Sequence, residues 1–128
     1  DRHPGAAVAM VAIDARMREA YCGAYRNDDV VSEVRAPALE APTTLASILR
    51  EAGADLVAGD ALSVFAADWG ELEAHSLPEL RGGAGDIARL ARIDFGRGLA
   101  TTAAEAMPLY VRDRVALTID ERRQKVSA

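Results

Sequence analysis

Two histidines, His3 and His75, are the side chains of this sequence best suited to hold a metal ion or to move a proton near neutral pH. They stand 72 positions apart, and no H-x-x-x-H or H-E-x-x-H spacing places two imidazoles on one helix face. We therefore expect no metal centre and no metal-dependent catalysis. His3 is interpreted as a solvated terminal residue and His75 as a loop residue.

The single cysteine, Cys22, is the strongest potential nucleophile, but a reactive thiolate needs a neighbouring group that lowers its pKa. Cys22 is predicted to lie in a strand, on the face opposite Tyr21, where a structural thiol is the simpler interpretation. No serine lies in a G-x-S-x-G turn. We therefore assign no catalytic residue.

Two glycine turns precede predicted helices, a position where backbone N–H groups can bind phosphate. The first is Gly59-Asp60, and the second comprises residues 82–85, followed by Asp86. An aspartate in each turn would occupy the donors at the helix end and repel a phosphate. The second turn also lacks the Lys-Ser/Thr pair of a P-loop. We interpret both as structural turns and expect no bound cofactor.

Asp14 and Arg16 are the most suggestive polar pair, because Asp14 ends a predicted buried strand and Arg16 follows in the turn. An ion pair or a turn hydrogen bond that fixes the hairpin is the favoured interpretation, and ligand binding is the alternative. A second cationic group lies near the end of the sequence, where contact with RNA or a protein partner is the alternative to simple solvation: Arg112, Arg114, Arg122, Arg123 and Lys125.

Length and composition bound the remaining possibilities. A chain of 128 residues can build one hydrophobic core, and no stretch approaches the roughly 20 apolar residues that cross a bilayer. One cysteine suits a reducing compartment, so we expect a cytoplasmic protein. The formal charge of −5 opposes autonomous nucleic-acid binding. The sequence starts without Met and without a secretion signal, so we expect a processed chain or a piece of one.

Hydrophobic spacing predicts the elements that position these residues. Strands are expected over residues 6–14, 19–26 and 30–35, where short runs of Val and Ile or alternating apolar positions occur. A turn with Asn27-Asp28-Asp29 joins the last two strands. Pro37 is expected to interrupt the sheet pattern after them.

Helical spacing begins after these strands. Residues 43–53 and the stretch from Asp60 to Trp69 place apolar side chains three and four positions apart, which predicts two amphipathic helices. Asp60 is the natural N-cap of the second helix. Residues 56–58 form a short buried strand between the two helices, and residues 72–74 are a weak strand candidate.

A third helix is predicted over residues 86–97, and Gly98 ends it. Its Ile87, Leu90 and Ala91 are expected to face inward. Residues 102–107 add a turn of helix before an extended segment.

Antiparallel strands followed by right-handed crossovers predict an α/β fold, a mixed sheet with three leading antiparallel strands and flanking helices. This is the pattern of an RNase H-like half-domain. Residues 1–118 are predicted to form this single domain, and residues 119–128 a charged, flexible tail.

Two distant segments resemble one known family. The first is VAIDARM, residues 11–17, followed by Tyr21 in the next strand, and the second is AEAMPLYVRDRVA, residues 104–116. Both are similar to segments of the TsaB (YeaZ) family, so the resemblance implies an RNase H-like half-domain of the actin, Hsp70 and sugar-kinase type. The resemblance suggests a set of structural or interaction residues: Asp14, Arg16, Tyr21, Tyr110, Arg112 and Asp113.

The resemblance covers only the second half of a TsaB-type protein, since the D-T-S-type opening strand of the family is absent. It implies a non-catalytic subunit in threonylcarbamoyladenosine modification of tRNA, with a TsaD-type transferase and a TsaE-type ATPase as partners. A homodimer is a further expectation. The alternative is an enzyme of the same superfamily, either ATP-binding or metallopeptidase-like, because the family is sometimes labelled an M22-type glycoprotease.

Overall fold

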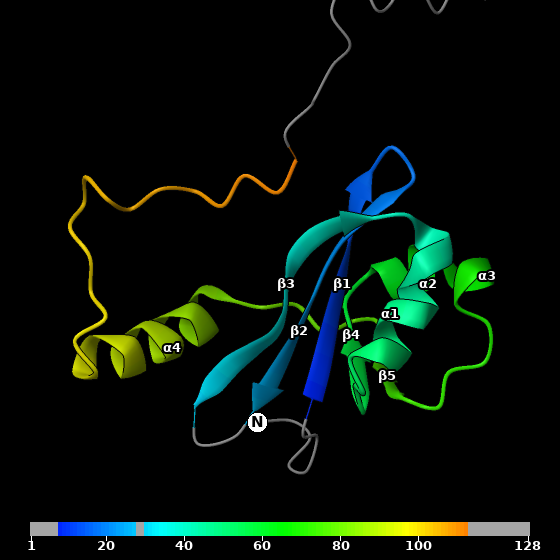
Figure 1. Cartoon of the computed structure of the whole chain (residues 1–128), viewed down its shortest axis with the longest axis horizontal. Helices are drawn as coiled ribbons and strands as arrows, with labels where there is room; N and C mark the ends of the chain where they lie inside the picture. Colours follow the sequence, from blue (N-terminus) through cyan, green and yellow to red (C-terminus); the bar gives the residue numbers. More distant parts are fainter. Residues whose placement is uncertain (1–7, 28–29, 113–128) are drawn as a thin grey trace, which may run out of the picture.

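The computed structural model describes residues 8–27 and 30–112. They form an α/β fold around a five-stranded mixed sheet with strand order β3-β2-β1-β4-β5 (Figure 1). The strands are β1 (Val8–Arg16), β2 (Glu19–Asn27), β3 (Val31–Glu40), β4 (Leu56–Ala58) and β5 (His75–Leu77). The helices are the 3-10 turn η1 (Pro42–Thr44), α1 (Leu45–Glu51), α2 (Ala61–Val64), α3 (Ala66–Trp69) and α4 (Ala84–Gly96).

The three leading strands are antiparallel, as predicted, and the two that follow the first helix are parallel to β1. In β1, alternation buries Val8, Met10 and Ala12 on one face of the sheet. Strand β2 places Cys22 on this same face and leaves Tyr21 half-buried on the other. The parallel pairs follow from crossovers through helices, so the predicted mixed sheet is confirmed.

Strand β3 is longer than predicted, because it continues through Pro37 to Glu40. Proline has no N–H, so in a central strand it would leave one ladder hydrogen bond unmade, but β3 is an edge strand with one neighbour. The pairing with β2 shifts register between Cys22 and Ala24, beside the proline. The edge position and this irregularity accommodate a residue that we expected to end the sheet.

The core lies between one face of the sheet and the layer formed by α1, α2 and α3 (Figure 1). Met10, Leu45 and Val57 are its largest fully buried side chains. Trp69 closes one side, and its indole N–H donates to the carbonyl of Ala61 at 3.1 Å. The apolar spacing of the first two predicted helices is therefore confirmed as core-forming.

The predicted helix from Asp60 to Trp69 is two short helices, because the chain bends at Phe65, where φ is −114° and ψ is 34°. The Ala61 carbonyl accepts both the Phe65 N–H and the Trp69 indole N–H. This bend lets Phe65 and Trp69 both pack into the core. Burial of two large aromatic side chains outweighs the continuity of a single helix.

The later elements depart further from prediction. Strand β5 occupies His75–Leu77 rather than residues 72–74, so His75 lies in a strand and not in a loop. Its partner β4 is short, and a backbone bond from His75 to Asp55 at 2.8 Å fixes the register. Residues 102–107 contain a single hydrogen-bonded turn, in which the Ala106 N–H donates to the Thr102 carbonyl at 3.1 Å, so the predicted turn of helix is present.

Helix α4 forms close to its predicted bounds, but Ile87, Leu90 and Ala91 do not face inward. None of its residues is buried within the described part of the chain. No helix in residues 8–27 and 30–112 is long and apolar enough to cross a membrane.

Gly59 should be the least replaceable glycine. Its φ is +115°, and a Cβ atom there would lie 2.1 Å from the carbonyl oxygen of Ala12 in β1. We expect Gly59→Ala to lower the free energy of unfolding by about 3 kcal/mol or more, because the backbone of the turn or of β1 must move to make room for the methyl group. Urea denaturation measures this loss.

Gly53→Ala is the matched control, since Gly53 also has a positive φ, +59°, but no atom lies within 4 Å of the added Cβ. It should cost only about 1 kcal/mol, from the backbone conformation alone. Equal costs for the two variants would contradict the close approach of Gly59 to β1.

Candidate functional site

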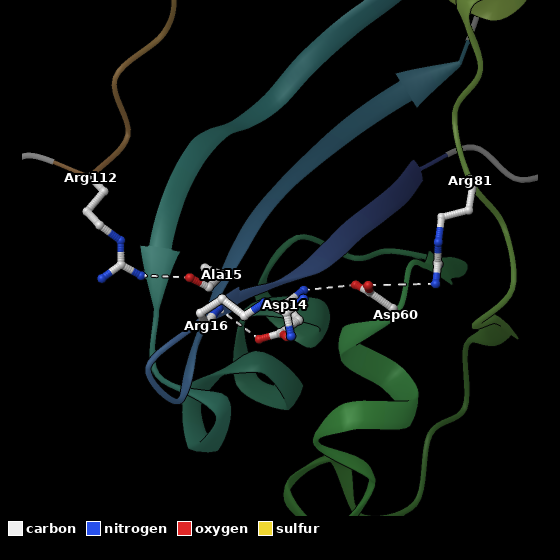
Figure 2. Close-up of polar contacts among 6 residues, drawn as sticks. All are labelled: Asp14, Ala15, Arg16, Asp60, Arg81 and Arg112. Atoms are coloured by element: carbon white, nitrogen blue, oxygen red, sulfur yellow. Dashed lines mark hydrogen bonds and ion pairs between the residues drawn. The ribbon is translucent and has the colours of Figure 1, made fainter. Parts of the chain in front are cut away.

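The two sequence segments that carry the family resemblance meet at the tip of the β1–β2 hairpin. Arg112, near the end of the described chain, donates to the Ala15 carbonyl at 3.0 Å (Figure 2). Its guanidinium also forms an ion pair with Glu19 at 2.6 Å, and its side chain is only 13% exposed. Tyr21 and then Glu19 raise the pKa of the Arg112 guanidinium above its usual value. Arg112 therefore anchors the final segment to the hairpin.

An open hollow of about 640 Å³ lies beside this contact. The hairpin contributes one wall and the anchored segment the other, and the lining residues are Ala15, Arg16, Met17, Tyr21, Leu109, Tyr110, Val111 and Arg112. Four of the six predicted site residues, Arg16, Tyr21, Tyr110 and Arg112, thus line one surface feature. Asp14 lies next to it, and Asp113 lies outside the described residues.

Asp14 fixes the turn of the hairpin. One carboxylate oxygen accepts the Arg16 backbone N–H at 2.9 Å, and the other pairs with the Arg16 guanidinium at 3.0 Å (Figure 2). The predicted ion pair is therefore present. Arg16, Met17 and Arg18 all have positive φ values between 55° and 65°, a conformation uncommon outside glycine. The Asp14 bonds help to hold this tight turn.

Asp60 joins the end of β1 to the start of α2. Its Oδ1 accepts the Asp14 backbone N–H at 2.9 Å, and its Oδ2 lies 3.6 Å from an Arg81 nitrogen (Figure 2). Asp60 stands at the N-cap position, but its side chain makes no capping bond to the helix. The prediction that its carboxylate occupies the helix-end donors was wrong, because the open backbone N–H of Asp14 in β1 is its partner.

The Gly59-Asp60 turn nonetheless offers little to a phosphate. The N–H groups of Leu62 and Ser63 already donate to the carbonyls of Gly59 and Asp60, at 3.3 Å and 3.0 Å. The Gly59 N–H donates to Leu77 in β5 at 3.2 Å. Three backbone donors at this turn, those of Gly59, Leu62 and Ser63, are thus used within the fold, and the carboxylate beside them repels anions. The geometry favours a structural turn.

The second glycine turn behaves as predicted. The Asp86 carboxylate accepts the Gly83 N–H at 3.0 Å, at the first turn of α4. Asp86 also pairs with Arg89 at 3.1 Å. A carboxylate therefore occupies the helix end that a phosphate would need.

The remaining candidates for chemistry lie apart from the hairpin hollow. Cys22 is buried in the core, and burial, with Glu40 next, raises the pKa of its thiol, which disfavours a thiolate. His75 lies in β5, and His3 is outside the described residues. Within residues 8–27 and 30–112, no group of three or more His, Cys, Asp or Glu side chains is arranged to hold a metal ion.

The cationic residues near the end of the sequence fall into two sets. Arg112 is described and engaged, whereas Arg114, Arg122, Arg123 and Lys125 lie outside the described residues. Sequence reasoning missed Glu19 and Arg81, the partners of Arg112 and Asp60. The sequence holds no local signal for either pair, because the partners lie on different elements.

Two solved structures are similar to this chain over most of its length. One is an uncharacterized protein with similarity to the peptidase YeaZ from Pseudomonas aeruginosa, with a TM-score of 0.72, 29% identity, and coverage of 87% of this chain and 52% of that chain. The other is YeaZ from Pseudomonas aeruginosa, with a TM-score of 0.71, 27% identity, and coverage of 85% and 51%. No protein-family model and no curated protein matches. This chain therefore spans about half the length of these neighbours.

Replacing Asp60 tests its link to β1. Asp60→Ala leaves the half-buried Asp14 N–H without its acceptor, so we expect the free energy of unfolding to fall by about 1–2 kcal/mol. Asp60→Asn keeps an oxygen acceptor and should cost less than about 1 kcal/mol. Chemical denaturation of both variants measures the difference.

Arg81→Ala is the control, because it removes the exposed ion pair at 3.6 Å and an exposed bond to the Pro78 carbonyl but leaves the Asp60 bond to β1 in place. It should change stability by less than about 0.5 kcal/mol. A loss in Arg81→Ala as large as that in Asp60→Ala would show that the ion pair, and not the bond to β1, holds the turn.

Replacing Arg112 tests the anchor of the final segment. In Arg112→Ala, chymotrypsin should cleave after the exposed Tyr110 several-fold faster than in the unmodified chain, because the segment detaches from the hairpin. Mass spectrometry of the fragments measures the rate. Cleavage after the exposed Phe95 is an internal reference and should not change. An unchanged rate after Tyr110 would contradict the anchor.

Proposed function

We propose that this chain, which is similar to YeaZ over about half of the YeaZ length, is the scaffold half of a TsaB-type subunit in threonylcarbamoyladenosine modification of tRNA. The similarity of fold and sequence to YeaZ is the observation that carries the proposal, and it confirms the resemblance to the TsaB (YeaZ) family. The five-stranded mixed sheet is assigned to the RNase H-like class under the same proposal. The subunit acts by binding a TsaD-type transferase in the cytoplasm.

The polar groups at the end of β1 support a role without catalysis. Glu19, beside the hairpin hollow, is paired with Arg112. Asp14 and Asp60, at the end of β1 and the start of α2, each accept a backbone hydrogen bond that holds the fold. An acid or base catalyst needs a carboxylate that is available to a substrate proton. These two carboxylates therefore serve the turn and the helix junction, and the chemistry belongs to the transferase.

The partner proteins supply what this chain lacks. A formal charge of −5 opposes independent binding to tRNA, so the tRNA contacts belong to other members of the assembly. At the Gly59-Asp60 turn the N–H groups of Gly59, Leu62 and Ser63 are bonded internally and a carboxylate faces the turn, which supports leaving the nucleotide to a TsaE-type ATPase. Within the described residues, the hairpin hollow is the candidate surface for contact with the transferase.

One of the two similar structures is of a protein with similarity to a peptidase. A metallopeptidase-like enzyme is therefore the second candidate function. Stoichiometric zinc in the purified protein, measured by elemental analysis, together with zinc-dependent cleavage of a peptide, would favour it over the scaffold.

A complementation assay tests the scaffold. In cells depleted of their TsaB-type protein, the gene that encodes this chain should restore the threonylcarbamoyladenosine content of tRNA. Mass spectrometry of tRNA nucleosides measures it. Asp14→Asn and Asp60→Asn should keep the modification within about twofold, because removal of a true acid–base catalyst costs roughly 100-fold or more.

The same cells report the partner. A tagged copy of this protein should co-purify with the TsaD-type transferase, and both Asn variants should do so equally. Absence of the modification and of the transferase from the purified material would refute the proposal. A loss of modification in Asp14→Asn with normal protein level and normal transferase binding would indicate catalysis instead.

A further inference from the structure

The tip of the β1–β2 hairpin is built from residues that a hairpin turn alone would not favour. Met17 and Arg18 form the two-residue loop between β1 and β2, and both have positive φ values, 55° and 57°. A two-residue loop of this kind favours Asn and Gly, which adopt positive φ at little cost. Arg16, at the end of β1, has a φ of 65° as well. Three successive residues other than glycine therefore hold a conformation that L-residues avoid.

The side chains of this hairpin tip (Arg16, Met17 and Arg18) gain no burial in return. All three are exposed, and Met17 is 70% exposed. The Met17 sulfur lies 3.5 Å from an Arg112 nitrogen, but a thioether is only a weak acceptor. Residues held in costly backbone conformations gather at functional sites. The hairpin tip therefore suits what its side chains present to solvent better than it suits the stability of the turn.

The hairpin tip is also held in one position from within the fold. Asp14 accepts the Arg16 N–H at 2.9 Å and pairs with the Arg16 guanidinium at 3.0 Å, and Asp60 accepts the Asp14 N–H at 2.9 Å (Figure 2). The Asp14 side chain is only 10% exposed, whereas the Arg16 side chain is 86% exposed. This pair therefore presents its cation to solvent. A surface that is already ordered binds a partner at a lower entropic cost.

Two hollows flank the hairpin tip, and Arg16 and Met17 line both of them. The hairpin hollow has Arg16 and Arg112 among its lining residues and no acidic residue. The second hollow, of about 540 Å³, lies between the hairpin tip and the residues of α2 and α3, and its lining has as many acidic as basic residues. Arg18 makes no ion pair within residues 8–27 and 30–112. An anionic group thus meets exposed guanidinium groups at the hairpin tip and in the hairpin hollow.

We propose that the hairpin tip is a contact site for an acidic surface of a protein partner. Carboxylates of the partner pair with Arg16 and Arg18, and an apolar pocket of the partner covers Met17. The inference rests on the proposed function, in which this partner is the TsaD-type transferase. The whole chain has a formal charge of −5, so a cationic tip is a place where an acidic partner is attracted rather than repelled.

A nucleic acid fits this site less well than an acidic protein. Nucleic-acid affinity depends on neutralising several closely spaced phosphates. The hairpin tip offers two arginines, and the second hollow places carboxylates beside them.

A change to the favoured turn sequence separates binding from folding. The double variant Met17→Asn with Arg18→Gly places Asn-Gly in the loop and removes both side chains. Its melting temperature should rise by about 2–6 °C, because Asn and Gly adopt positive φ more readily. Its affinity for the purified transferase, measured by isothermal titration calorimetry, should fall at least tenfold. A loop with a structural role alone would keep its affinity as its stability rises.

Charge reversal locates the contact. Arg18→Glu should weaken the complex with the transferase at least tenfold at low salt, and higher salt should reduce this difference. Arg50→Glu is the matched control, because Arg50 is also exposed but lies in the last turn of α1, on the body. It makes the same change in net charge and should leave the affinity within about twofold.

The outcomes separate this inference from the proposed function. No binding of the transferase by the unmodified chain would refute the proposed function and this inference with it. Binding that survives both changes at the hairpin tip would overturn this inference alone. Equal weakening by Arg18→Glu and Arg50→Glu would do the same, since net charge would then be responsible. Loss of tRNA from the assembly with unchanged binding of the transferase would make RNA the ligand and also overturn it.

Discussion

The packing of the Gly59-Asp60 turn against β1 is the constraint on which the rest of the structure depends. Gly59 approaches the Ala12 carbonyl so closely that no side chain fits, and Asp60 accepts the Asp14 N–H just beyond it. These two contacts fix where β4 ends and α2 begins relative to the end of β1. The Asp14 side chain then holds the hairpin turn, and the hairpin provides the carbonyl and carboxylate that bind Arg112. One close approach between two backbone segments thus sets the geometry of both the core and the hollow.

Local sequence patterns predicted the parts of the fold that short-range physics decides. The strand at residues 56–58 and the core-facing positions of α1 were correct because apolar spacing follows directly from burial. Pro37 was misjudged because its tolerance depends on β3 being an edge strand, which is a property of the whole sheet. The bend at Phe65 depends likewise on a tertiary bond between Trp69 and Ala61.

In the candidate site, too, local contacts were predictable from the sequence and long-range contacts were not. The Asp14–Arg16 pair was predictable, since the two residues are neighbours in one turn. The bond from Asp60 to Asp14 and the ion pair of Arg112 with Glu19 join residues far apart in sequence, and no periodicity reports them. Helix α4 shows a third limit, because its spacing predicted an apolar face correctly but not what that face contacts. A sequence pattern specifies which side of a helix is apolar, whereas what covers that side depends on tertiary contacts that the pattern does not report.

The long separation between Arg112 and the hairpin also affects the order in which the fold assembles. The hairpin contact joins residues 97 positions apart, from Ala15 to Arg112, whereas β1 and β2 pair within one short turn. Closing so large a loop costs chain entropy that a local hairpin does not. During synthesis at roughly 5–20 residues per second, the hairpin therefore waits several seconds for its last partner to leave the ribosome. In that interval the Glu19 carboxylate lacks the ion pair that it makes with Arg112 in the folded chain.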